Sequence, residues 1–66
     1  NVVSDAGVAV MAAYGALKSA ALNVYINIGS IKDKDFADNR QAALEAILQT
    51  ADIATEEIYK MVKDKL

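Results

Sequence analysis

The hydrophobic and polar positions fall into two long segments that meet at Ile28-Gly29-Ser30-Ile31. Residues 1–31 contain two charged side chains, Asp5 and Lys18, whereas residues 32–66 contain fourteen. Gly29 suits the C-terminal end of a helix, and either Ser30 or Asp33 can cap the helix that follows. The pattern predicts an all-α helical hairpin, with one helix over about residues 5–28 and a second over about 34–64.

The second predicted helix is amphipathic. Its solvated face recurs at helical spacing through Asp38, Glu45, Gln49, Asp52, Glu56 and Lys63. The opposite side carries Phe36, Ala43, Ile47, Ala51, Ala54, Ile58 and Met61, and Leu44, Leu48, Val62 and Leu66 widen this stripe. Glu56 and Lys60 form a favourable pair one turn apart. We expect the apolar stripe to pack on the first helix and the solvated face to meet water.

The first predicted helix is apolar nearly all round. One seam runs through Val10, Tyr14, Leu17, Ala21, Val24 and Ile28, and a second row holds Met11, Leu22 and Tyr25 with Gly15 and Lys18 between them. A third row consists of Asp5, Ala9, Ala13, Ala16, Ala20, Asn23 and Asn27. The middle positions of this row carry small side chains. Such a helix is expected to be buried on every side. One partner helix cannot cover three faces, so we expect a bundle with more helices than this chain supplies.

A membrane span is the alternative interpretation of this apolar segment. A span needs about 20 predominantly apolar residues. Lys18 lies in the middle of the segment, and Asn23 and Asn27 follow it. Burying such polar and charged side chains in the hydrocarbon of a bilayer costs free energy. We therefore favour the central helix of a soluble bundle and expect no membrane association.

Length and composition further limit the possible classes of fold and function. Sixty-six residues make at most one small domain. The absence of Cys and His excludes disulfides and the usual zinc sites, so no metal is expected, and either association or the rest of a larger protein must supply stability. A net charge of −2 argues against a general nucleic-acid binder. No basic segment precedes the apolar run, which argues against a signal peptide. Because Asn1 is not Met, we expect a segment upstream of it.

Particular residues also carry a family resemblance. Ser4-Asp5 opens a small-residue helix, Ala20-Ala21-Leu22-Asn23-Val24-Tyr25-Ile26-Asn27 follows, and Ile31-x-Asp33-x-x-Phe36 leads into a long final helix. The chain resembles the C-terminal part of the formiminotransferase-cyclodeaminase family. The resemblance implies an all-α, up-and-down bundle that dimerises, in which residues 1–66 are the C-terminal two-helix portion of a single domain.

The same resemblance implies a cytoplasmic enzyme whose substrate is a tetrahydrofolate derivative. In the cyclodeaminase reaction, formimino-tetrahydrofolate closes to methenyl-tetrahydrofolate and ammonia leaves. In the cyclohydrolase reaction, water opens the methenyl ring to give 10-formyl-tetrahydrofolate. This segment does not separate the two, and we expect the fragment alone to be inactive.

Either reaction passes through a tetrahedral carbon between two nitrogens and needs a group that moves protons. Asp5 is the candidate catalytic residue, because a carboxylate in the first turn lies near free backbone N–H groups. Ser4 is a candidate substrate contact beside it. The alternative is that Ser4 or Asp5 caps the helix.

Four further residues are candidate substrate contacts. Asn23 and Asn27 either bind ligand or clamp the second helix and the turn, because a buried amide must be hydrogen-bonded. Asp5 and Asn23 are eighteen residues apart, about 27 Å along one helix, so they cannot meet in one site within a chain. Lys18 either extends past a neighbouring helix or pairs with a carboxylate. Arg40 either contacts a carboxylate-bearing tail or is a solvated flank position.

Tyr14 and Tyr25 are interpreted as core aromatics with a hydroxyl at the margin. A non-catalytic module is the competing function, in which the hairpin pairs with another copy as a structural or interaction element. Periodicity cannot separate it from an enzyme fragment, because both show the same seams. An enzyme fragment and a non-catalytic module would differ in whether Asp5, Asn23 and Asn27 line a cavity or have their hydrogen bonds satisfied within the protein.

Overall fold

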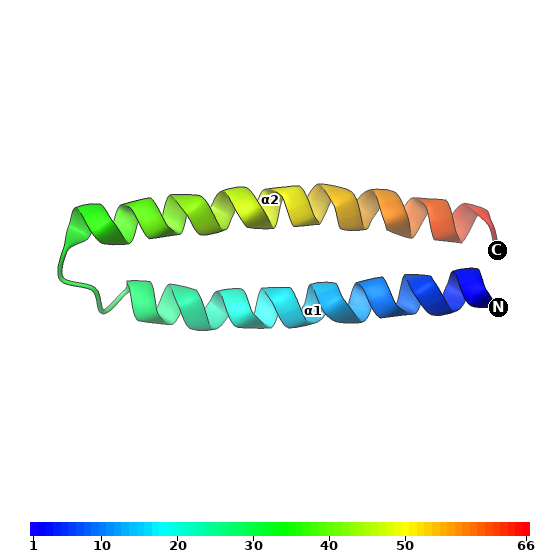
Figure 1. The fold of residues 1–66 in the computed structure, drawn as a ribbon, viewed down its shortest axis with the longest axis horizontal. Coiled ribbons are helices and arrows are strands. Elements are labelled where there is room, and N and C mark those ends of the chain that lie inside the picture. Colours follow the sequence, from blue (N-terminus) through cyan, green and yellow to red (C-terminus); the bar gives the residue numbers. More distant parts are fainter.

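The computed structural model describes all 66 residues as two antiparallel α-helices (Figure 1). Helix α1 spans Val2–Ile28, and helix α2 spans Lys34–Asp64. A short turn joins them, so both termini lie at the same end of the hairpin. The predicted all-α antiparallel hairpin is confirmed. Its membership of a larger bundle stays a prediction.

The helix ends agree with the sequence at the turn and differ at the N-terminus. Helix α1 begins at Val2 rather than near residue 5, with Asn1 as its N-cap. The alternative in which Ser4 or Asp5 caps the helix is therefore wrong, because Asn1 is the N-cap and its side chain accepts from the Ser4 N–H. At the turn, Gly29 ends α1 in a right-handed conformation, and Asp33 caps α2 by accepting from the Phe36 N–H at 3.1 Å.

The predicted seam of α1 forms the contact with α2 except at Val24, which is 40% exposed. Ala21 and Ile28 are buried, and Val10, Tyr14 and Leu17 are half-buried between the helices. Two glycines of α1 differ in surroundings: a Cβ on Gly7 would lie 2.8 Å from Val62 Cγ1, whereas a Cβ on Gly15 would meet nothing within 4 Å. Gly7 therefore permits close approach of the two helices at their open end.

The contact face of α2 is one edge of the predicted apolar stripe. The sequence placed its centre on the row that holds Phe36, Ile47 and Met61, but these side chains are 49%, 59% and 59% exposed. The residues that pack on α1 are Ala37, Leu44, Leu48, Ala51, Thr55, Ile58 and Val62. Five of these seven residues belong to the predicted stripe, and Ala37 and Thr55 do not. From Leu44 onward they recur at spacings of three and four, and the small residues among them allow close approach. Helix α1 therefore covers one edge of a stripe that is too wide for a single partner.

Much of the surface of the hairpin is left uncovered. Only four residues are buried, and the small-residue row from Asp5 to Asn27 is exposed along its whole length. The accessible surface is 5077 Å² for 7.0 kDa, against about 4,000 Å² for a compact protein of that mass. The radius of gyration is 15.4 Å, against about 11 Å for a compact domain. The expected burial of α1 on every side is not reached within this chain.

Helix α1 is also long and apolar enough to cross a membrane, judged by length and composition alone. Its most apolar 18-residue window has a mean hydropathy of 1.3, and 6% of that window is buried in the hairpin. A central helix of a bundle has the same length and hydropathy. The expectation of no membrane association therefore stays a prediction.

Candidate functional site

The candidate residues lie at three levels along the hairpin. Ser4 and Asp5 lie near the open end, Lys18 lies midway along α1, and Asn23 and Asn27 lie near the turn. Arg40, in the second turn of α2, also belongs to the turn end. The structure does not gather these residues into one site.

Ser4 and Asp5 have different surroundings although they are neighbours. The Ser4 hydroxyl donates to the Asn1 carbonyl oxygen at 2.9 Å, and its N–H donates to Asn1 Oδ1 at 3.0 Å. The Asp5 carboxylate is exposed in the first turn, where the helix N-terminus favours negative charge. Ser4 lines a cavity and Asp5 does not.

Asn23 and Asn27 point to an uncovered face of α1. Both are exposed, and no hydrogen bond joins either side chain to α2 or to the turn. The hydroxyl of Ser30 does bond near this point, but it donates to the Asn27 main-chain oxygen at 3.2 Å. The two amides therefore do not clamp the hairpin, which corrects that alternative. Their amide groups remain free for a partner outside this chain.

The two candidate cations contact aromatic rings. The Lys18 ammonium lies 6.0 Å from the centre of the Tyr14 ring, and the Arg40 guanidinium lies 5.1 Å from the centre of the Phe36 ring. Neither forms an ion pair; the hairpin contains one, between Lys60 and Glu56 at 3.7 Å. Cation–π contacts of this kind stabilise exposed sites modestly and leave the donor groups free.

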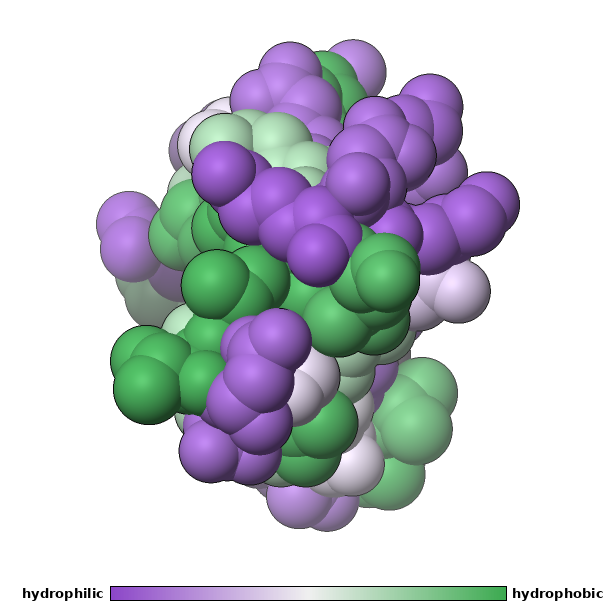
Figure 2. All heavy atoms as spheres, turned by 90° about the vertical axis from the view of Figure 1, so that its right-hand side faces the viewer, coloured by the Kyte–Doolittle hydropathy of each residue, from purple (hydrophilic) through white to green (hydrophobic).

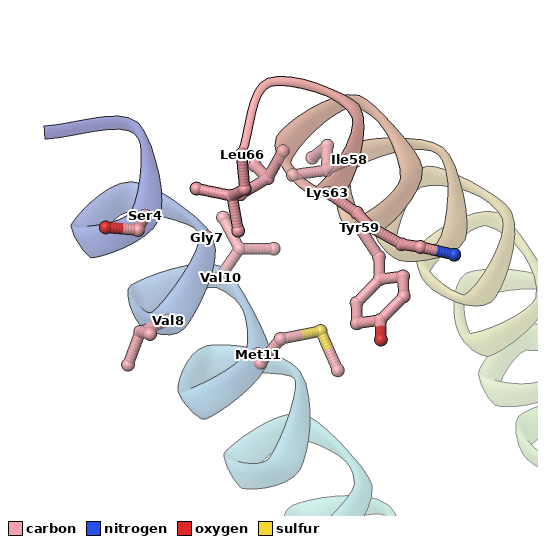
Figure 3. Close-up of a pocket in the computed structure, with 10 residues that line it drawn as sticks. Ser4, Gly7, Val8, Val10, Met11, Ile58, Tyr59, Lys63 and Leu66 are labelled. Carbon is pink, nitrogen blue, oxygen red and sulfur yellow. The ribbon is translucent and has the colours of Figure 1, made fainter. Parts of the chain in front are cut away.

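A cavity of about 320 Å³ opens between the helices at the end that holds the termini (Figure 3). Seven of its ten lining residues are hydrophobic, and the set comprises Ser4, Gly7, Val8, Val10, Met11, Ile58, Tyr59, Val62, Lys63 and Leu66. In Figure 3 the Met11 side chain reaches toward the Tyr59 ring, and the Lys63 chain runs out past it. Seen from this end in Figure 2, hydrophilic residues cover the upper side, and hydrophobic residues gather below them.

A second cavity, of about 200 Å³, is more polar. Met11, Tyr14, Asp52, Thr55, Glu56 and Tyr59 line it. The Tyr14 hydroxyl donates to Asp52 Oδ1, and this is the one side-chain hydrogen bond that joins the two helices. The bond to the Asp52 carboxylate raises the pKa of the Tyr14 hydroxyl, with smaller contributions from desolvation and from the charge of Asp52.

Sequence reasoning did not identify this polar cluster. It assigned Asp52 to the solvated face of the second helix and singled out neither Thr55 nor Tyr59. Asp52 is indeed exposed, but it lies beside Tyr14 once the helices are paired. The register of an antiparallel hairpin, counted back from the turn, is the signal that could have placed these two residues at one level.

Comparisons with known proteins agree with the resemblance. A family model described as formiminotransferase-cyclodeaminase matches residues 1–46. A methenyltetrahydrofolate cyclohydrolase of Methylorubrum extorquens is 52% identical over 66 residues, which cover 100% of this chain and 32% of that protein. The chain thus spans about a third of the length of this relative. No solved structure matches.

Proposed function

Because the chain belongs to the formiminotransferase-cyclodeaminase family, we propose that it forms part of a cytoplasmic folate one-carbon enzyme, and specifically of a methenyltetrahydrofolate cyclohydrolase. The observation that carries the proposal is the 52% identity, along the whole chain, to a relative of that name. Cyclodeamination is the second candidate within the family. Asp5, Asn23 and Asn27 line neither cavity between the helices, so the cavity criterion does not favour the enzyme. Membership of the family does, and the non-catalytic module is the less favoured alternative for that reason.

The uncovered faces of the hairpin support a role as part of a larger assembly. Catalysis needs a site that excludes bulk water, and a hairpin with four buried residues does not enclose one. We therefore assign the exposed small-residue row of α1 to packing against another helix, from a second copy or from further chain. Homo-oligomerisation through this row is part of the proposal.

The proposed reaction sets the chemistry that the side chains must perform. Water adds to the carbon between two nitrogens of the methenyl ring and gives up a proton. One carbon–nitrogen bond then breaks: the new hydroxyl loses its proton to become the formyl oxygen, and the departing nitrogen takes up a proton. One proton is released overall. Asp5 is the proposed acceptor of the proton. Ser4, Asn23, Asn27, Lys18 and Arg40 are the proposed substrate contacts. Asp5 and Asn23 lie about 27 Å apart along α1, so they serve different sites or meet across an oligomer.

A chimera tests the proposed function. In it, this chain replaces the matching 66 residues of the Methylorubrum cyclohydrolase. We expect the chimera to hydrolyse methenyl-tetrahydrofolate, measured by the loss of absorbance of the methenyl form against the uncatalysed rate. A chimera that keeps the helicity and assembly of its parent but hydrolyses no substrate would contradict the proposal. Assaying formimino-tetrahydrofolate in parallel separates the two reactions of the family.

Asp5→Asn in the chimera tests the assignment of the proton acceptor. A general base contributes about 10²–10⁴-fold to rate, so kcat should fall by that order. Asp38→Asn is the matched control, because Asp38 is exposed and lines no cavity. An unchanged kcat in Asp5→Asn assigns Asp5 to the helix terminus alone and removes it from the reaction.

A further inference from the structure

The small-residue row of α1 is nearly symmetric along its length. Its middle positions are Ala9, Ala13, Ala16 and Ala20. These alanines are evenly placed about a point between Ala13 and Ala16, with Asp5 beyond one end and Asn23 and Asn27 beyond the other. Every residue of the row is exposed in the hairpin. A helix face with this symmetry can pair with a second copy of itself about a twofold axis, with the two helices antiparallel.

Antiparallel pairing brings opposite ends of the row together. When Ala13 of one copy lies opposite Ala16 of the other, Asp5 lies at a level between Asn23 and Asn27 of the second copy, about 1.5 Å from the level of Asn23. Eighteen residues are about five turns of an α-helix, so Asp5 and Asn23 leave α1 in the same direction. The twofold axis keeps these two directions on one side of the helix pair. The separation of about 27 Å within one helix is thus removed between two copies.

A hydrophobic groove on α2 lies at the same level and on the same side of the hairpin. Its lining residues are Ala46, Ile47, Thr50, Ala51 and Ala54. The hydrogen bond between Tyr14 and Asp52 aligns the two helices, and it places this part of α2 beside the middle of the alanines of α1. The cavity around that bond lies on one flank of the contact between the helices. At 3.6 residues per turn, the small-residue row and the groove both lie on the other flank, so one partner can cover them together.

The size and charge of this face suit a second copy. The two helices side by side measure 49 × 16 Å (Figure 1), so a face-to-face pair covers on the order of 800 Å² of each copy. Each partner in a stable complex buries about that area. Asp5 is the one charged residue of the small-residue row, and the groove has none. Parallel pairing would place Asp5 beside Asp5, whereas antiparallel pairing places it beside amides, which donate to carboxylates.

We propose that two copies of the chain pair antiparallel through this face and build each site jointly, with Asp5 from one copy and Asn23 from the other. The dimer then holds two equivalent sites related by the twofold axis. The proposal rests on the proposed function, in which Asp5 takes the proton from the attacking water. The Asn23 amide of the second copy donates a hydrogen bond to the water-derived oxygen on the tetrahedral carbon. A single hairpin holds no such site, and neither residue lines a cavity between its helices.

A disulfide between introduced cysteines tests this pairing without an assay of activity. The chain has no cysteine of its own. In the 66-residue double variant Asp5→Cys/Asn23→Cys, the two thiols of one chain are about 27 Å apart and cannot react with each other. We expect mild oxidation to give a covalent dimer, measured by non-reducing denaturing electrophoresis. Asp5→Cys alone is the matched control and should stay a single chain, because antiparallel pairing keeps the two Asp5 positions at opposite ends. Equal amounts of covalent dimer from both variants, or none from either, would overturn the proposal.

Hybrid dimers test whether the two residues serve one site. Asp5→Asn and Asn23→Leu are each made in the chimera described above, and we expect Asn23→Leu to lower kcat by about tenfold or more. Co-expression of the two variants gives hybrids in which one of the two sites keeps both original residues. About half of the dimers are hybrids, so activity should return to about a quarter of that of the unaltered chimera.

Co-expression of Asp5→Asn with Asp5→Ala is the matched control, because no hybrid of these variants holds an intact site. Hybrids that are confirmed by mass spectrometry but regain no activity would overturn the shared site. Full activity of Asn23→Leu by itself would overturn it as well.

These measurements separate the two proposals. An inactive chimera, together with the expected cross-link in the 66-residue chain, keeps the pairing of Asp5 with Asn23 and removes the cyclohydrolase assignment. An active chimera whose hybrids regain no activity keeps the cyclohydrolase assignment and removes the shared site.

Discussion

Gly7 and Gly15 lie on the same helix, two turns apart, and the hairpin uses them differently. A Cβ on Gly7 would approach Val62 Cγ1 and Cγ2 to 2.8 and 3.2 Å, whereas a Cβ on Gly15 would meet open space. The side chain of Val62 is β-branched and has little rotational freedom in a helix, so it cannot move aside cheaply. Gly7 is thus required by the pairing of α1 with α2, and Gly15 is not.

This difference predicts opposite effects of the same substitution. Gly15→Ala should stabilise the chain by about 1 kcal/mol, because alanine is the better helix former and meets no neighbour. Gly7→Ala gains the same propensity but overpacks against Val62, at a cost of about 1–3 kcal/mol. Thermal unfolding followed by circular dichroism should therefore rank Gly15→Ala above the wild type and Gly7→Ala at or below it. The reverse order would contradict the close approach at Gly7.

Tyr14 predicts an alkaline dependence of stability. Its hydrogen bond to Asp52 raises the pKa of the hydroxyl above the ordinary value of 10.0. The folded state therefore binds this proton more tightly than the unfolded state, so the contribution is fully present below pH 10 and is lost as the pH rises through the folded-state pKa. Tyr14→Phe should flatten the dependence of the melting temperature on pH above pH 10. Tyr59→Phe, whose hydroxyl has no hydrogen-bond partner in the hairpin, should keep the wild-type dependence.

At the scale of the elements, α2 shows what the sequence can and cannot predict. Its bounds follow from local chemistry, because Asp33 supplies the cap and the change in charge density marks the turn. Its contact face follows only in part, because the predicted stripe holds two neighbouring rows and a single partner helix covers one of them. One row contains Phe36 and Ile47, and the other contains Leu44 and Leu48. Only the approach of α1 decides between them.

The Asp33 cap gives a prediction for α2 alone. Asp33→Ala removes the acceptor for the Phe36 N–H and should destabilise the hairpin by about 1 kcal/mol. Asp33→Asn retains an acceptor and should lie close to the wild type. Chemical denaturation followed by circular dichroism compares the three chains. Equal losses in both variants would show that the charge of Asp33 matters and that its hydrogen bond does not.

The candidate site was predictable only where it depends on local sequence. Ser4, Asp5, Asn23 and Asn27 were singled out as candidates from a motif along α1, and Asp5, Asn23 and Asn27 share one row of that helix. The contact between Tyr14 and Asp52 joins residues 38 apart, and it depends on how two long helices align over several turns. The register counted back from the turn could have placed the two residues at one level, but the hydrophobic pattern of neither helix shows that their side chains meet.

At the scale of the whole molecule, the uncovered surface predicts association. The hairpin measures 49 × 16 × 10 Å and exposes about a quarter more surface than a compact protein of its mass. The alanine row in the middle of α1 lies outside the contact with α2, and small residues let two backbones approach closely. We expect the 66-residue chain to form a dimer or a larger oligomer with Ala13 and Ala16 near the centre of its interface.

Ala16→Glu should abolish that association, because it places an unpaired charge where two helices meet at close range. Gln49→Glu adds the same charge to the solvated face of α2 and should leave the assembly intact. Size-exclusion chromatography with light scattering gives the mass of each variant. An Ala16→Glu chain that keeps the wild-type mass would exclude the alanine row as the interface. A wild-type chain that is monomeric and melts cooperatively would show that two helices with four buried residues are sufficient for folding and that the uncovered surface does not drive association.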